Sequence, residues 1–331
     1  MFDNKLPKLL RDYLNYSSNL NKSSNTIKEY QYDLVNFLKY IKLQSINNKK
    51  MTIDDIETIT DIDSKFLNNI DINDLYEYMT YLKDKCNDSA VTRARKVASL
   101  RGFFKYLHVK ARVIDDNPAK ELESPKLGKR LPKFLTLEQS TSLLDGVKNA
   151  PLTGKQHDNR LRDYAIITLF LNCGMRLAEL VGIDITHIKF DEALLTVIGK
   201  GNKERTIYLN KAALSAIKEY LEVRPTDGVV DKNALFLSER KTRISRRTVQ
   251  NLIKNYLRNI CGLSEHYSTH KLRHTAATLM YQYGDVDIRA LQEILGHESI
   301  ATTEIYTHVD NSQIREAVEN NPLANYNPKE Q

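Results

Sequence analysis

Four short segments of this 331-residue chain contain the residues best suited to chemistry on an anionic ester. They are CGMRLAEL (173–180), GKGNKER (199–205), HKLRH (270–274) and LGHESIATTEIYTHV (295–309). Arginine presents a planar fork of donors to anionic oxygens, histidine and lysine move protons, and a tyrosine hydroxyl can serve as a nucleophile. Taken singly, each residue has a plainer explanation. A lone Arg176 would usually form a surface ion pair, and Tyr306 is one of eighteen tyrosines.

Taken together, the four segments resemble the motifs of the tyrosine recombinases, and most of all those of the bacterial Xer recombinases. The family's Gly-x-Arg motif is matched at residues 174–176, and its lysine in a glycine-flanked hairpin turn is matched by Lys200. Its His-x-x-Arg-His motif is complete at residues 270–274. Its Leu-Gly-His motif is matched at residues 295–297, and Tyr306 follows nine residues later (306 − 297 = 9). The match spans about 135–310, and no catalytic position departs from the family pattern.

The resemblance implies a set of catalytic residues: Arg176, Lys200, His270, Arg273, His297 and Tyr306. Tyr306 would attack a DNA phosphodiester and form a 3′-phosphotyrosine, and Lys200 would be the general acid that protonates the leaving 5′ oxygen. The arginines and histidines would stabilise the charge of the transition state. No metal and no other cofactor is expected, because guanidinium and imidazole groups supply the stabilisation that a metal ion would give.

The distribution of basic residues predicts a DNA partner. The chain has a net charge of +7 and a pI near 9.0. Residues 89–112 contain no acid, and residues 239–258 contain one. Two solvated helix faces would explain such stretches, but two clusters this pure suit a clamp on a phosphate backbone. Together with the hairpin they supply the predicted DNA-binding residues: Arg93, Arg95, Lys96, Arg101, Lys105, Lys203, Arg205, Arg243, Arg246 and Arg247.

Composition favours a globular cytoplasmic protein, and the expected DNA partner implies that it associates with the nucleoid. Mean hydropathy is −0.48, no apolar run reaches membrane length, and the first residues lack the apolar core of a signal peptide. Cys86, Cys173 and Cys261 are too far apart in sequence for a paired zinc or disulfide pattern. We expect no membrane partner and no small-molecule substrate.

Hydrophobic periodicity predicts helices in the first part of the chain, over 25–42, 71–83 and 89–108, with a polar loop and short helical pieces over 43–65. The proline-containing stretch 113–134 indicates an extended linker. After it, residues 161–182 are helical in pattern with a break at Gly174. Residues 193–199 and 204–209 form a hairpin pattern with a basic tip, and helix resumes from 211.

We therefore expect a mainly α fold with a small β-hairpin. By resemblance, residues 1–112 would form an all-α SAM-like core-binding domain, 113–134 a linker, and 135–331 a mixed α/β catalytic domain. The two domains would form a C-shaped clamp on DNA. A helix over 311–319 would be exchanged between protomers of a tetramer.

The expected activity is site-specific recombination through a Holliday junction, at an imperfectly palindromic duplex site bound by a homo- or hetero-tetramer. It would resolve chromosome or plasmid dimers. The alternatives are a simple integrase or excisionase of a mobile element, a type IB topoisomerase-like enzyme, and an inactive DNA-binding protein. The topoisomerases lack the spacing from Leu-Gly-His to tyrosine, and the presence of every catalytic residue argues against an inactive protein.

Overall fold

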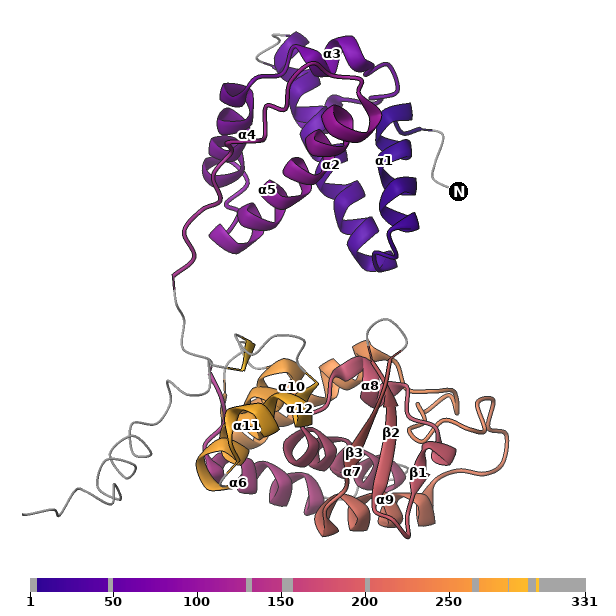
Figure 1. The fold of residues 1–331 in the computed structure, drawn as a ribbon. Helices are drawn as coiled ribbons and strands as arrows, with labels where there is room; N and C mark the ends of the chain where they lie inside the picture. Colours follow the sequence, from indigo (N-terminus) through magenta and orange to yellow (C-terminus); the bar gives the residue numbers. More distant parts are fainter. Residues whose placement is uncertain are drawn as a thin grey trace, which may run out of the picture. The chain divides into compact units, whose positions relative to one another are not determined.

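The chain divides into two compact units, Met1–Lys129 and Arg130–Gln331 (Figure 1). The computed structural model describes residues 5–46, 50–128, 133–150, 157–199, 203–263, 268–284, 286–296 and 302–303. It is mainly helical, with one three-stranded antiparallel sheet in the second unit. Among the described residues, no helix is long and apolar enough to cross a membrane.

The first unit is built from helices. They are α1 (Lys8–Asn19), α2 (Ser24–Ile46), η1 (Ile53–Asp55), α3 (Ser64–Asn68), α4 (Ile72–Asp84), α5 (Ala90–Lys105) and η2 (Tyr106–Ala111). Short polar side chains begin several of them: the Ser23 hydroxyl accepts the Thr26 N–H, the Asp71 carboxylate accepts two N–H groups of α4, and Ser89 accepts the Thr92 N–H of α5. The helices predicted over 25–42, 71–83 and 89–108 are therefore present.

The core of the first unit lies between α2 and α5. Leu34, Phe37 and Leu38 of α2 and Phe103 and Phe104 of α5 are fully buried. The hydrophobic periodicity of the predicted 89–108 helix includes Val91, and the expectation that this residue is buried is wrong, since its side chain is 66% exposed. Val91 lies in the first turn of α5, where its spacing alone did not bury it.

The segment predicted as an extended linker from residue 113 is packed for part of its length. Ile114, Ala119 and Leu122 are buried in the core of the first unit. Arg101 donates to the Leu122 carbonyl, and the Asp115 N–H donates to the Asn68 side chain over 2.8 Å. Apolar residues between the charged and proline positions thus hold the chain onto the helices, and the first unit extends beyond residue 112.

The second unit contains α6 (Leu137–Lys148), α7 (His157–Cys173), α8 (Leu177–Val181), η4 (Ile185–His187), β1 (Ile188–Lys189), β2 (Leu194–Ile198), β3 (Glu204–Tyr208), α9 (Lys211–Val223), α10 (Arg246–Cys261), α11 (Thr269–Tyr283) and α12 (Ile288–Leu295). The sheet order is β1-β2-β3, and Thr196 of β2 pairs with Thr206 of β3. The predicted hairpin is present, with β1 as a third strand that was not predicted. The prediction of continuous helix from 211 is wrong for residues 224–245, which form turns and isolated bridges.

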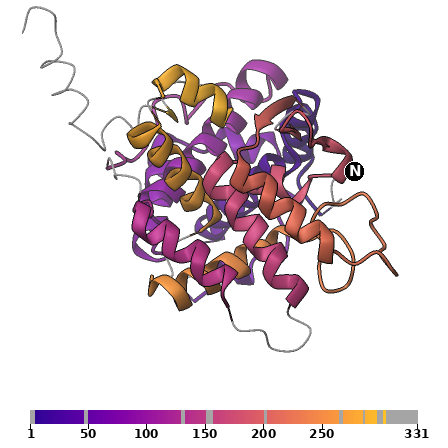
Figure 2. The same ribbon diagram turned by 90° about the horizontal axis from the view of Figure 1, so that it is seen from below.

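Helix α7 is the central element of the second unit. It packs against α6, α9 and α11, and the view from below shows α6, α7 and α9 side by side (Figure 2). Ala165, Ile166, Ile167, Leu169 and Phe170 are all fully buried, so α7 is apolar around most of its circumference. The end of such a helix is held rigidly, and this end carries the first arginine of the candidate site.

Candidate active site

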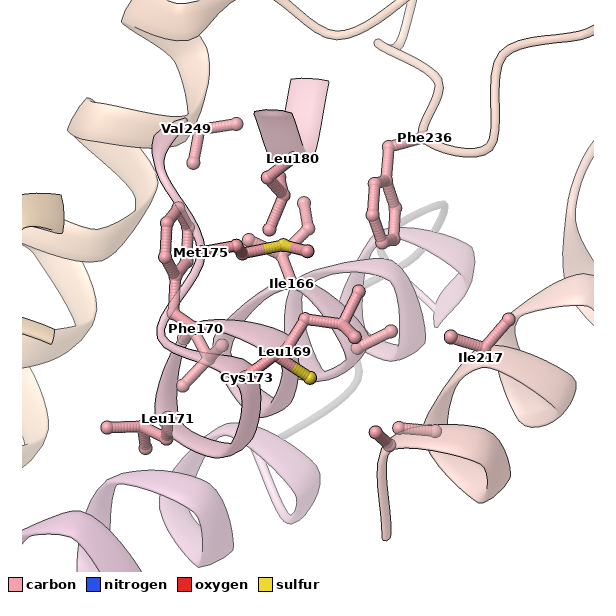
Figure 3. Close-up of a cluster of buried hydrophobic side chains, with 14 of the residues drawn as sticks. Ile166, Leu169, Phe170, Leu171, Cys173, Met175, Leu180, Ile217, Phe236 and Val249 are labelled. Carbon is pink, nitrogen blue, oxygen red and sulfur yellow. The ribbon is translucent and has the colours of Figure 1, made fainter. Parts of the chain in front are cut away.

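The loop between α7 and α8 places Arg176. Gly174 ends α7 in a left-handed conformation (φ +57°), which glycine adopts without strain. Met175 is fully buried, and Figure 3 shows its side chain among Phe170, Ile166 and Leu180. Met175 therefore anchors the turn in the core, and the next residue, Arg176, begins α8 with a half-exposed side chain.

Glu179 is the carboxylate that holds Arg176. Its Oε2 accepts the Arg176 backbone N–H (2.7 Å) and its Oε1 accepts Arg176 Nη1 (3.0 Å). Arg205 on β3 donates to the same carboxylate, with Nη2 2.9 Å from Oε2. Burial by itself would raise the pKa of Glu179, but the hydrogen bonds and charges of Arg205 and Arg176 outweigh it and lower the pKa. Glu179 is thus a buried anion between two guanidinium groups.

The C-terminal end of α12 is the second anchor for these arginines. Arg176 Nη2 donates to the Gly296 carbonyl, and Arg205 Nη1 donates to the Ile294 carbonyl. Gly296 has a left-handed conformation (φ +63°), and a Cβ atom there would lie 2.9 Å from Arg205 Cδ. The close approach of the two chains therefore requires glycine at this position.

Arg273 reaches the same helix end from α11. Its side chain is almost completely buried; Nη1 donates to the Gly174 carbonyl (2.7 Å) and Nη2 to the Leu295 carbonyl (2.6 Å). The carbonyls of residues 294, 295 and 296 thus each accept a hydrogen bond from a different arginine. Carbonyls at a helix C-terminus carry partial negative charge and favour cations. The end of α12 consequently gathers three positive charges that lie far apart in the sequence.

His270 lies one helical turn before Arg273 on α11. Its ring packs edge-to-face on His274, with 4.6 Å between ring centroids. Partial burial and the positive charges of Arg273, Lys271 and Arg176 lower the pKa of His270 below its usual value. The imidazole is therefore uncharged near neutral pH, the form in which one ring nitrogen donates and the other accepts a proton.

Three of the predicted catalytic residues, Lys200, His297 and Tyr306, lie outside the described residues, as does the predicted helix over 311–319. The residues on either side of two of them are described. Gly199 precedes Lys200, and its backbone N–H donates to the Lys203 carbonyl (2.8 Å) across the base of the hairpin. Gly296, before His297, accepts Arg176. Among the described residues the structure brings together Arg176, His270 and Arg273.

Comparisons with known proteins agree with this arrangement. The phage integrase family model matches residues 133–313, and the model of the phage integrase N-terminal SAM-like domain matches residues 43–110. The chain belongs to the phage integrase family of tyrosine recombinases.

Individual relatives lead to the same family. A tyrosine recombinase XerC of Caldanaerobacter subterraneus subsp. tengcongensis is 52% identical over 97% of this chain and 88% of its own. A tyrosine recombinase XerC of Thermodesulfovibrio yellowstonii is 35% identical over 85% of this chain and 92% of its own. These relatives and the family model make the chain a site-specific recombinase, an enzyme of the tyrosine class.

Solved structures share the fold. A XerH recombinase bound to its difH substrate has a TM-score of 0.69 at 22% identity, covering 94% of both chains. A lambda integrase dimer bound to a COC′ core site has a TM-score of 0.64 at 15% identity, covering 89% of this chain and 95% of the other.

In the first unit of this recombinase, some of the predicted DNA-binding residues pair with carboxylates of the same unit, and others are exposed to solvent. Arg95 forms ion pairs with Asp33 (2.6 Å) and Glu29 (2.8 Å), and Lys96 is 7% exposed and paired with Asp88 (2.8 Å). Arg93 is half-buried, and its Nε has no hydrogen-bond partner among the described residues. Arg101 and Lys105 are exposed, although Arg101 also holds the Leu122 carbonyl. Lys96 therefore contributes to the folding of the unit and presents little charge to solvent.

The predicted DNA-binding residues of the second unit divide similarly. Lys203, Arg246 and Arg247 are exposed, and the last two open α10 after the N-cap Ser245. Arg243 instead bonds inward, to the carboxylates of Asp184 and Asp231 and to two main-chain carbonyls. Arg205 also bonds inward, in the site described above.

Sequence reasoning missed the structural role of Glu179 and the inward orientation of Arg205. Glu179 was visible only as part of the motif around Arg176. A signal existed, because a glutamate three residues after Arg176 is at the N3 position of a helix beginning there. Nothing local indicated that Arg205 would turn toward it, since 26 residues separate the two in the chain.

Proposed function

We propose that this recombinase cleaves and rejoins duplex DNA through a 3′-phosphotyrosine at Tyr306, and that strand exchange proceeds through a Holliday junction. The observation that carries the proposal is the convergence of Arg176 and Arg273 on the end of α12, one residue before His297. The XerH and lambda integrase structures that share the fold both contain bound DNA, which supports DNA as the substrate.

The proposed first step needs concentrated positive charge. Attack of the Tyr306 oxygen on phosphorus forms an O–P bond and breaks the bond to the 5′ oxygen, while a second negative charge develops on the non-bridging oxygens. Arg176 uses one N–H on each terminal nitrogen to bind Glu179 and Gly296, and a guanidinium has five N–H groups. Arg176 can therefore serve the phosphate without leaving its anchors. Loss of one such preorganised donor typically reduces the rate about 100- to 1000-fold.

Lys200 and His270 take roles in proton transfer, and Arg273 contributes charge. Lys200 donates the proton that the departing 5′ oxygen needs, and a neutral His270 assists the proton transfer from Tyr306. Arg273, enclosed by protein, contributes its charge across a short distance in surroundings where electrostatic interactions are strong.

We further propose that two protomers bind one imperfectly palindromic site and that four form the synaptic assembly that resolves chromosome or plasmid dimers. The similarity to tyrosine recombinases named XerC supports a role of this kind.

Covalent capture tests the chemistry and recovers the target sequence in the same experiment. The protein is incubated with fragmented genomic DNA, denatured in SDS, and the protein-linked DNA is recovered and sequenced. A nicked duplex built around the recovered site then traps the intermediate. We expect wild type to give the SDS-resistant complex and Tyr306→Phe to give none while still binding DNA. Tyr208→Phe, which changes a tyrosine that is 82% exposed on β3, is the matched control and should cleave normally. A covalent complex in Tyr306→Phe would place the nucleophile elsewhere.

A further inference from the structure

Arg205 lies in a basic hairpin whose sequence suggests contact with DNA phosphate. We propose instead that Arg205 is a positioning residue for the cleavage reaction, which acts through Glu179 and the end of α12. The assignment rests on the proposed DNA cleavage activity and adds to it a residue that touches neither the substrate nor the reacting atoms.

The geometry directs Arg205 into the protein. Its side chain is 17% exposed, and both terminal nitrogens donate inward: Nη2 to Glu179 (2.9 Å) and Nη1 to the Ile294 carbonyl. Nε lies 3.4 Å from the second oxygen of the same carboxylate. A guanidinium that binds a carboxylate through a fork and a carbonyl at the same time is fixed in both position and orientation. It is therefore unsuited to follow a mobile phosphate.

The contacts of Arg205 join three parts of the site. Arg205 belongs to β3, and in the sequence Lys200 lies between β2 and β3. Glu179 holds the backbone and side chain of Arg176, and Ile294 belongs to the helix end that Arg176 and Arg273 also bind. Gly296, whose added Cβ would meet Arg205 Cδ at 2.9 Å, shows how closely the strand and the helix end approach.

Charge gives Arg205 a second effect on Arg176. Burial raises the pKa of Glu179, and the hydrogen bonds of Arg205 are the first of the interactions that lower it. Without Arg205, Glu179 would be protonated more readily and would accept less strongly from Arg176. Among the residues that the structure describes, the other titratable or charged groups near this cluster are Arg176 itself, Arg273, Cys173 and His270. Burial raises the pKa of Cys173 to about 12, so its thiol remains neutral over the working pH range.

The test compares Arg205→Met and Arg205→Lys with wild type in single-turnover cleavage of the nicked duplex at saturating protein. Arg205→Met should cleave about 10- to 100-fold more slowly, with DNA affinity and its salt slope unchanged. Its cleavage rate, divided by that of wild type, should rise with pH as Glu179 ionises. His270 titrates in both proteins and cancels in that ratio. Arg205→Lys retains the charge but not the fork, so its rate should fall less and its pH profile should match wild type.

Arg224→Met is the control for a merely structural arginine. Arg224 donates to the carbonyls of Lys232, Ala234 and Leu235, and its hydrogen bonds within the described part of the chain reach none of the described site residues. Its replacement should lower the melting temperature but not the cleavage rate measured well below that temperature. Arg205→Lys keeps the test decisive if Arg205→Met does not fold.

Two results would overturn the assignment. One is a salt slope about one unit smaller with normal cleavage at saturation, which identifies a phosphate contact. The other is a cleavage rate and pH profile unchanged in both variants. If wild type itself forms no covalent complex, the proposed function fails, and the role of Arg205 in cleavage fails with it.

Discussion

Replacement of Gly296 by alanine tests the packing of the site at one atom. Gly296 and Gly262 both end helices in the left-handed conformation, with φ +63° and φ +62°. A Cβ at Gly262 meets nothing within 4 Å, whereas a Cβ at Gly296 meets Arg205 Cδ at 2.9 Å and Nε at 3.1 Å. The two substitutions therefore share the backbone strain and differ in the contact with Arg205.

The expected magnitudes follow from that difference. Left-handed backbone costs an L residue about 1–2 kcal/mol, and alanine recovers part of this by restricting the unfolded chain. We expect Gly262→Ala to lower the free energy of unfolding by about 1 kcal/mol. Gly296→Ala should lower it by about 2–4 kcal/mol, because Arg205 must move and weaken its pairing with the buried Glu179. In a domain of 150–250 residues, each kcal/mol corresponds to about 2–4 °C in melting temperature.

The assays are urea unfolding followed by circular dichroism and single-turnover cleavage of the nicked duplex. Gly262→Ala should cleave at the wild-type rate. Gly296→Ala should be at least about 10-fold slower, because the same displacement disturbs the anchoring of Arg176. Equal losses of stability and equal cleavage rates in the two variants would refute the reasoning.

Two further predictions concern charge. Replacing Arg246 and Arg247 by glutamine should reduce the log–log slope of DNA affinity against salt concentration by roughly 2 units. Lys96→Met should instead lower the stability of the protein and leave that slope unchanged, because Lys96 is paired with Asp88. A smaller salt slope in Lys96→Met would contradict this. Burial raises the pKa of Asp163 to about 6, despite its pairing with Arg162, so this group favours the folded state at low pH and that contribution is lost as pH rises through 6. The titration of Asp163 should lower the unfolding free energy of wild type by on the order of 2–3 kcal/mol between pH 4 and 7. An identical pH dependence of the unfolding free energy in Asp163→Asn would exclude this contribution.

Local sequence determined most of the secondary structure and the identity of the chemical groups. The pattern over 89–108 correctly indicated α5, the hairpin pattern over 193–199 and 204–209 correctly indicated β2 and β3, and Gly174 marked the break after α7. These features depend on interactions within a few residues, where helix geometry and backbone preference act directly. The family motif likewise lies in the order and spacing of residues along the chain.

Tertiary structure alone decided which distant groups the charged side chains bind. Arg205 pairs with Glu179 across 26 residues, Arg95 with Asp33 across 62, and Arg176 with Gly296 across 120. An arginine in a basic stretch has the same sequence whether it points to solvent or to a buried carboxylate. Its environment depends on which helix end or carboxylate the folded chain brings alongside it. The site consequently depends on long-range packing of α7, α12 and the β2–β3 hairpin, which no local pattern specifies.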